Sequence, residues 1–177
     1  MAKAINVTGS TVSSRDDSFL YHVMSGMNGL FKYGNQMDCT TVSANLLKIK
    51  DGIAQIQGRN FIIYPSETID INIENGTQGN RRYDLIVLEF SKTSNNESME
   101  IKVVKGTQTT GNPFDPQLVQ QDTLSSGTIY QLPLYRIKLD GINIMGVDDL
   151  RKYIPSLKAS LQVVSETDDY IEVEFNK

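Results

Sequence analysis

Short runs in which apolar and polar residues alternate one by one recur along this chain, and this period of two constrains its fold more than any other feature. Leu47 and Ile49 alternate with lysines, and the same pattern returns at 69–74, 99–103 and 171–175. Alternation of this kind puts the apolar side chains on one face of a β-strand. We therefore expect many short strands, each with one buried face.

The dipeptide Asp51-Gly52 separates two of these runs and predicts a tight hairpin. An Asp-Gly pair suits a two-residue type I′ turn, because both central residues of that turn need positive φ. In this register Ile49 faces Ala54, so that the turn chemistry and the apolar pattern agree. We expect the strands before and after the dipeptide to pair with each other.

Further strands follow from the same reasoning. A second turn at 58–60 leads into a strand over 61–64, and the run 83–90 is apolar on both faces, which is typical of a central strand. The run at 99–103 then returns beside it in a second hairpin. Another strand is expected over 129–139, where Pro133 marks an edge or a bulge.

The remaining segments are richer in turn-forming residues. The stretch 106–128 is a long Gly-, Pro- and Gln-rich connection in which we expect a short helical turn over 116–121. A short strand begins at 142–144, and 148–153 is interpreted as a polar turn or short helix. A last hairpin fits 161–175. Because a lone two-stranded hairpin is marginal in water, it must pack on the main body or on another copy of the chain.

One helix is predicted near the N-terminus. Ser14 or Asp16 is expected to cap a helix that begins near Asp17 and runs for about three turns. The apolar residues of this segment recur at helical spacing and form one stripe, which we expect to pack against a sheet. They are Phe19, Leu20, Val23, Met24 and Met27.

Together these patterns give roughly eight to ten short strands and one helix. Parallel βαβ units are excluded, because turns and loops rather than helices join the strands. The predicted fold class is all-β, a mainly antiparallel β-sandwich or partly open barrel with one short N-terminal helix. We divide the chain into an N-terminal arm over 1–14, a β-rich domain over 15–155 and a C-terminal β-hairpin over 156–177.

Charge and hydropathy argue against two classes of partner. The formal net charge is −4, and the densest basic spots are the pairs Arg81-Arg82 and Arg151-Lys152, so no nucleic-acid partner is expected. No run of about 18 apolar residues occurs, so no membrane partner is expected. The N-terminal segment lacks the apolar stretch of a secretory signal, which indicates synthesis in a cytoplasm.

The chain offers little for catalysis or ligand chemistry. It has one cysteine and one histidine, Cys39 and His22, which fall on different predicted elements, and Cys39 is interpreted as a small buried strand residue. The adjacent carboxylates at 16–17, 148–149 and 168–169 point to opposite faces or to water, although a calcium ion at one of them is an alternative. We predict no catalytic residue, no cofactor and no metal site.

Four motifs follow the helical segment in a fixed order. They are GIAQIQG at 52–58, RYDLIVL at 82–88, VKGT at 104–107 with proline-rich residues after it, and YQLPL at 130–134. Their order resembles the N-terminal module of phage and prophage baseplate (upper baseplate), tail-fibre and minor tail structural proteins of Gram-positive bacteria. The resemblance covers residues 15–153.

The resemblance implies a virion structural protein that is not an enzyme. Such a protein is made in the bacterial cytoplasm and resides in the virion tail or baseplate, as a homo-oligomer related to a trimer or hexamer, bound to other baseplate or tail proteins. The segments 1–14 and 156–177 are the expected contacts.

Members of the family often continue into a fibre or a receptor-binding head, whereas here only a hairpin follows the module. We therefore expect an assembly component. The alternative is a carbohydrate- or host-receptor-binding module for host adsorption, with host cell-wall polysaccharide as partner. Against a dedicated sugar-binding face, there is no Trp, and the tyrosines of the predicted strands are scattered. These are Tyr64, Tyr83, Tyr130 and Tyr135.

Overall fold

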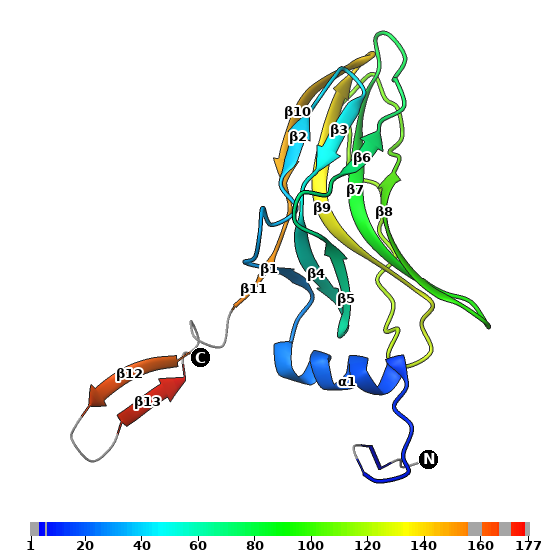
Figure 1. The fold of residues 1–177 in the computed structure, drawn as a ribbon. Helices are drawn as coiled ribbons and strands as arrows, with labels where there is room; N and C mark the ends of the chain where they lie inside the picture. The colour runs from blue at the N-terminus through cyan, green and yellow to red at the C-terminus, as the bar shows by residue number, and fades with distance from the viewer. Residues whose placement is uncertain (1–3, 6, 156–160, 167–170, 176–177) are drawn as a thin grey trace.

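A computed structural model of the chain describes residues 4–5, 7–155, 161–166 and 171–175 (Figure 1). Within these ranges the chain forms one helix, α1 (Ser14–Ser25), and thirteen strands. The strands are β1 (Gly29–Phe31), β2 (Cys39–Thr41), β3 (Leu46–Ile49), β4 (Gly52–Ile56), β5 (Arg59–Ile63), β6 (Ile69–Asn72), β7 (Arg81–Lys92), β8 (Glu97–Val104), β9 (Ile129–Asp140), β10 (Asn143–Asp149), β11 (Tyr153–Ile154), β12 (Leu161–Glu166) and β13 (Ile171–Phe175).

The predicted all-β class with one short helix is confirmed. A long, curved sheet in the order β10-β9-β7-β8 faces two shorter sheets, β11-β1-β4-β5 and β2-β3-β6, in a sandwich-like arrangement (Figure 1). Nearly all neighbouring strands are antiparallel, and the exception is the short parallel pair of β1 with β11. The last strands, β12 and β13, form the expected hairpin and pair with each other.

The hydrophobic core lies between the long sheet and the two shorter ones. Every second residue of β7, from Ile86 through Phe90, turns a buried side chain toward it. The shorter sheets supply the opposing layer through residues such as Leu47 and Ile49 of β3 and Ile56 of β4. The period of two seen in the sequence therefore reports the inner faces of a two-layer structure.

The prediction of a hairpin across Asp51-Gly52 is wrong. Strand β3 pairs with β2 and β6, whereas β4 pairs with β1 and β5, so the two strands belong to different sheets. The Asp51 carboxylate accepts hydrogen bonds from the Asn35 backbone N–H at 3.2 Å and from its Nδ2 at 2.5 Å. The side-chain bond is the main cause that lowers the pKa of Asp51.

Gly52 completes this corner between sheets. A Cβ added to Gly52 would lie only 2.6 Å from the backbone nitrogen of Met37, and the same nitrogen donates a hydrogen bond to the Asp51 carbonyl at 2.9 Å. The glycine is therefore needed for the close approach of the segment around Met37, and the dipeptide does not form a hairpin turn.

The two-residue turn lies one strand later, between β4 and β5. Gln57 and Gly58 have φ values of 46° and 80°, and Ile56 pairs with Arg59 across them. Positive φ at both central residues is the signature of the type I′ turn. The second predicted turn, at 58–60, is thus real but begins at Gln57.

Other predictions for the strands are confirmed. Strand β7 is central, between β8 and β9, and the β7–β8 hairpin is present. Strand β6 pairs with β3 and has one buried face. Pro133 lies beside a bulge, where the register shifts between Ile86 and Val87 of β7. It does not mark an edge, because β9 has strand neighbours on both sides.

Two local predictions in the connections are wrong. Residues 116–121 form no helical turn and run irregularly over the long sheet, with one isolated bridge between Gln120 and Tyr130. Nearby, the Asp115 carboxylate pairs with Arg136 of β9, which fixes the extended path of the segment. Residues 148–149 belong to β10 rather than to a turn or helix, because Asp148 pairs with Arg136 and Lys138 on the neighbouring strand.

A buried ion pair fastens the long sheet to its connections. The Arg82 Nε lies 2.9 Å from the Asp84 Oδ1, and both side chains are 1% exposed. Arg82 also donates hydrogen bonds to the carbonyls of Glu74 and Asn75, while Asp84 accepts one from the Gly106 N–H at 2.9 Å. One ion pair therefore joins β7 to the segment before it and to the chain leaving β8.

Replacing Arg82 should be far more damaging than replacing the residue beside it. The Arg82→Met substitution leaves the Asp84 carboxylate buried without its partner, which costs about 3–5 kcal/mol of unfolding free energy. Arg81→Met removes only the exposed pair with Asp140 and should cost less than about 1 kcal/mol. Urea unfolding of the two variants gives the comparison, and equal losses would contradict the role given to the buried pair.

Candidate interaction surface

Helix α1 has well-defined ends. Its N-cap is Ser13, which accepts a hydrogen bond from the Asp16 N–H at 3.2 Å, and the Asp16 carboxylate accepts one from the Ser13 N–H at 2.8 Å. This is a capping box, so Ser13 takes the capping role predicted for Ser14 or Asp16. At the other end Gly26 adopts a left-handed conformation and donates to the His22 carbonyl at 2.8 Å.

The side of α1 that faces the protein is polar. Ser18 is 1% exposed, and His22 and Ser25, one and two turns further along on the same side, are half-buried. The helix rests on the β4–β5 turn, where a Cβ on Gly58 would lie 1.7 Å from the Ser18 carbonyl oxygen. Backbones that approach this closely leave no room for large side chains between them.

The opposite side of α1 is apolar and exposed. Leu20, Val23 and Met24 lie on this side, and it is flanked by Phe19, on the edge nearest the loop at 121–128, and by Tyr21 on the other edge. We call these five residues the α1 face: Phe19, Leu20, Tyr21, Val23 and Met24, which are 43%, 41%, 49%, 79% and 70% exposed. Figure 1 shows α1 across one end of the sandwich, with its far side turned away from the three sheets. The prediction that the apolar stripe packs against a sheet is therefore wrong, and Met27 lies beyond the end of the helix.

Gln57 anchors the loop next to α1. Its side-chain oxygen accepts hydrogen bonds from the Thr123 N–H at 2.8 Å and from the Thr123 hydroxyl at 2.5 Å, and its Nε2 donates to the Gln121 carbonyl at 3.2 Å. Its backbone N–H donates to the Asn28 side chain at 2.6 Å. The turn that supports α1 thus also holds the loop from Gln121 to Thr128 in place.

Arg59 extends this network toward the long sheet. It forms an ion pair with Glu97 of β8 at 3.3 Å, donates to the Thr123 hydroxyl at 3.2 Å and lies 4.3 Å from the centre of the Phe90 ring. Burial alone would raise the pKa of Glu97, but the hydrogen bonds and charges of Arg59 and Lys92 outweigh it and lower that pKa. Glu97 therefore stays ionised and links the two layers.

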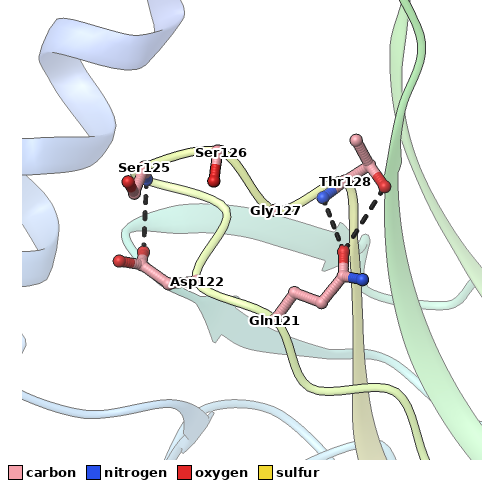
Figure 2. Close-up of a pocket in the computed structure, with 6 residues that line it drawn as sticks. All are labelled: Gln121, Asp122, Ser125, Ser126, Gly127 and Thr128. Carbon is pink, nitrogen blue, oxygen red and sulfur yellow. Dashed lines mark hydrogen bonds between the residues drawn. The ribbon is translucent and has the colours of Figure 1, made fainter.

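A shallow cleft lies between α1 and the anchored loop. One part, of about 480 Å³, is lined by residues of α1, the β4–β5 turn and the loop, and a second part of about 460 Å³ continues along the loop, sharing Asp122 and Ser125. In Figure 2 the Gln121 oxygen accepts from Thr128, and Asp122 accepts from the Ser125 N–H. These bonds close the loop on itself and preform the cleft.

The cleft contains the three residue types of a serine-hydrolase triad, in His22, Asp122 and Ser125. A triad needs hydrogen bonds from the nucleophile to the base and from the base to the acid. The buried His22 Nδ1 has no hydrogen-bond partner, and the Asp122 Oδ1 accepts from the backbone N–H groups of Leu124 and Ser125. The three side chains are not connected as a triad requires.

Cys39 and His22 lie far apart. Cys39 is on β2, in the sheet β2-β3-β6, whereas His22 is on α1, which rests on the β4–β5 turn of another sheet. Burial, together with the charge of Asp38, raises the pKa of Cys39 to about 11, so that its thiol is protonated at neutral pH. Cys39 lies on a strand, as predicted, and is half-buried.

Three of the adjacent carboxylates that the structure describes serve structural roles. Asp16 belongs to the capping box, Asp148 pairs with Arg136 and Lys138, and Asp149 pairs with Arg151 at 2.7 Å. The pair at 168–169 lies outside the described residues. Within the described ranges, no three His, Cys, Asp or Glu side chains gather as metal ligands would.

The four tyrosines of the predicted strands do not share one surface role. Tyr64 is largely exposed just after β5, whereas Tyr135 is buried and donates its hydroxyl hydrogen bond to the Met37 carbonyl at 3.0 Å. Tyr83 lies under the Arg136 guanidinium, and Tyr130 packs beside the core. Burial raises the pKa of Tyr135 above its ordinary value.

Sequence reasoning found four residues of the α1 face, all but Tyr21, but missed how the helix is held. The roles of Gln57, Arg59 and Thr123 could not be read from their neighbours in sequence, because their partners lie 29 to 66 residues away. The one local signal for the position of the helix was Gly58, at the end of the GIAQIQG motif, because the close contact with α1 requires a glycine there.

The chain matches no protein-family model, and a comparison with curated proteins finds no match either. No helix in the part of the chain that the structure describes has the length and apolar character needed to cross a lipid bilayer. The interpretation of the α1 face therefore depends on the geometry of the molecule itself.

Substituting Gly58 should disturb the contact between α1 and the β4–β5 turn. Both Gly58→Ala and Gly79→Ala place an alanine at a left-handed φ, of 80° and 82°, but nothing lies within 4 Å of a Cβ on Gly79. We expect Gly79→Ala to cost about 1 kcal/mol of unfolding free energy and Gly58→Ala at least about 2 kcal/mol more. Urea unfolding measures the difference, and hydrogen exchange should show faster exchange of the α1 amides in Gly58→Ala alone. Equal losses of unfolding free energy, with unchanged hydrogen exchange of the α1 amides, would contradict the role given to this contact.

The Cys39 thiol should react slowly with thiol reagents. With a pKa of about 11, only about 0.1% of it is thiolate at pH 8, whereas an unfolded cysteine with a pKa near its ordinary value of 9.0 is about 10% thiolate. We therefore expect alkylation by iodoacetamide at pH 8 to be about 100-fold faster in urea than in the native protein, and the native rate to rise with pH up to about 11. A native rate close to the unfolded rate would indicate an activated thiol.

Proposed function

We propose that this protein is a non-enzymatic structural component of a phage or prophage virion, made in the bacterial cytoplasm and built into the baseplate or tail tip as a homo-oligomer related to a trimer or hexamer, in contact with other tail proteins. The observation that carries the proposal is the α1 face, which is apolar and turned away from the core. The family resemblance of the sequence supplies the biological context.

The physical argument concerns what covers the α1 face. An amphipathic helix at the surface of a monomer normally turns its apolar side inward, because burying apolar area contributes roughly 25 cal/mol per Å². In α1 the buried residue is Ser18, while Val23 and Met24 are the most exposed of the large apolar residues in the helix. An apolar patch held outward in this way is typical of a protein–protein contact.

The motifs that carry the resemblance have identifiable structural roles. Gly52 and Gly58 of GIAQIQG allow close backbone approaches at the corner between sheets and under α1. Arg82 and Asp84 of RYDLIVL form the buried ion pair, and Gly106 of VKGT donates to that pair. The residues of these three motifs thus make fixed structural contacts, as expected for a shared structural module. The assignment to a virion rests on analogy.

A structural role also agrees with the chemistry of the described residues. The thiol of Cys39 is protonated at neutral pH, and His22 shares no hydrogen bond with Asp122 or Ser125 in the cleft. Nucleophilic catalysis requires an activated nucleophile beside an oriented base. What the described residues do provide is a network of buried polar contacts that makes the end of the sandwich rigid.

Purified particles test the proposed function. We expect particles induced from the bacterium that carries the gene to contain this chain after density-gradient purification and a high-salt wash, and an antibody against it to label the tail tip in electron micrographs. A host cytoplasmic enzyme followed through the same gradient is the control for contamination. A chain that stays with the cytoplasmic enzyme and is missing from the particles would overturn the proposal.

A further inference from the structure

We propose that the α1 face binds the α1 face of a second copy of this chain, with the two helices antiparallel about a twofold axis. The inference rests on the proposed function, since it names the partner of the surface on which that function depends. It makes the helix a contact between identical subunits rather than a site for a different tail protein.

The shape of the α1 face suits a helix–helix contact. Leu20, Val23 and Met24 are spaced i, i+3 and i+4, and Phe19 lies one turn before Val23. Residues at this spacing form a ridge that fits the groove of another helix. Because the polar side of α1 is fixed on the β4–β5 turn, the apolar side is presented to a partner without rearrangement.

The size of the α1 face fits a weak contact between copies. Its five exposed fractions correspond to at most about 500 Å² per chain, because a fully exposed aromatic side chain offers roughly 150–250 Å² and Leu20, Val23 and Met24 are smaller. Two copies would then bury at most about 1,000 Å², which is in the range of weak interfaces. We expect association in roughly the micromolar range, strengthened when other contacts hold the copies in one assembly.

Charge decides the direction of the two helices. Asp16 and Asp17 lie in the first turn of α1, so a parallel pair would bring four carboxylates to the same end. In an antiparallel pair whose twofold axis lies between Leu20 and Val23, these carboxylates lie about 13–17 Å from their symmetry mates along the helix axes, beyond the Debye length of about 8 Å in physiological salt. Antiparallel helix dipoles also attract each other.

A twofold contact is compatible with a larger assembly. On its own it gives a dimer, because an isologous interface closes after two copies. Where the same chain also forms a threefold ring through another surface, the α1 contact joins two rings into a hexamer. The proposal therefore adds a defined contact to the trimer- or hexamer-related arrangement that the family resemblance implies.

Single engineered cysteines test the contact and its direction. In a Cys39→Ser background, we expect Leu20→Cys and Val23→Cys to form disulfide-linked dimers under mild oxidation, because residues near a twofold axis approach their symmetry mates. Met145→Cys, on β10 at a residue that is 67% exposed, is the matched control and should stay unlinked. Asp17→Cys should also stay unlinked, since it meets its mate only in a parallel pair. The proposal would be overturned if Leu20→Cys and Val23→Cys both formed disulfide-linked dimers no faster than the control, or if Asp17→Cys formed them rapidly.

A charge placed on the α1 face should weaken self-association. We expect sedimentation equilibrium of the wild-type chain to show a monomer–dimer equilibrium, with the dissociation constant raised at least tenfold by Met24→Lys and unchanged by Met145→Lys. Matching urea unfolding curves show that both variants are folded. A wild-type chain that remains monomeric at the highest soluble concentration would overturn the contact.

The outcomes separate this inference from the proposed function. If the chain is present in particles but its α1 cysteines do not link, another subunit covers the α1 face, and the pairing of copies is wrong while the assembly role stands. If the cysteines link but the chain is missing from particles, the pairing stands and the virion assignment is overturned.

Discussion

The contact between Ser18 and the glycine of the β4–β5 turn determines how the rest of the proposed interaction surface is presented. A Cβ on Gly58 would lie 1.7 Å from the Ser18 carbonyl oxygen, so the backbones of helix and turn nearly touch. Such an approach admits only small or polar side chains on the inner side of α1. The large apolar side chains are consequently turned outward, and the same contact that fixes the helix also exposes its apolar side.

The fold was predictable from the sequence where the signal was local, and not where distant residues decide the pairing. Alternation identified the inner faces of β3 and β6, and the run over 83–90 that is apolar on both faces identified β7 as a central strand. The pairing of β3 with β4 was mispredicted, because the Asp51 carboxylate binds Asn35, sixteen residues earlier, and directs the chain into a second sheet. The same turn geometry occurs instead at Gln57-Gly58, a pair with a weaker sequence signature than Asp-Gly.

The candidate interaction surface, too, was predictable only in part. Helical spacing correctly grouped Phe19, Leu20, Val23 and Met24 on one side of α1, but periodicity cannot tell whether that side meets the core or a partner. The usual rule for a monomer, apolar side inward, gave the wrong answer. The rule fails at a surface that binds a partner in an assembly. There the partner, rather than the chain's own core, covers the apolar side chains.

The network beneath α1 explains how a short helix at one end of a sandwich can act as a rigid contact. Arg59 of β5 joins Glu97 of β8, and Thr123 joins both Arg59 and Gln57, so the turn under the helix is tied to the long sheet and to the loop beside it. Ser14 of α1 reaches the same Glu97 at 3.5 Å. A surface held by bonds to both layers loses little conformational entropy on binding, and a load applied to the helix is shared by both layers. These are the properties that a building block of a large assembly requires.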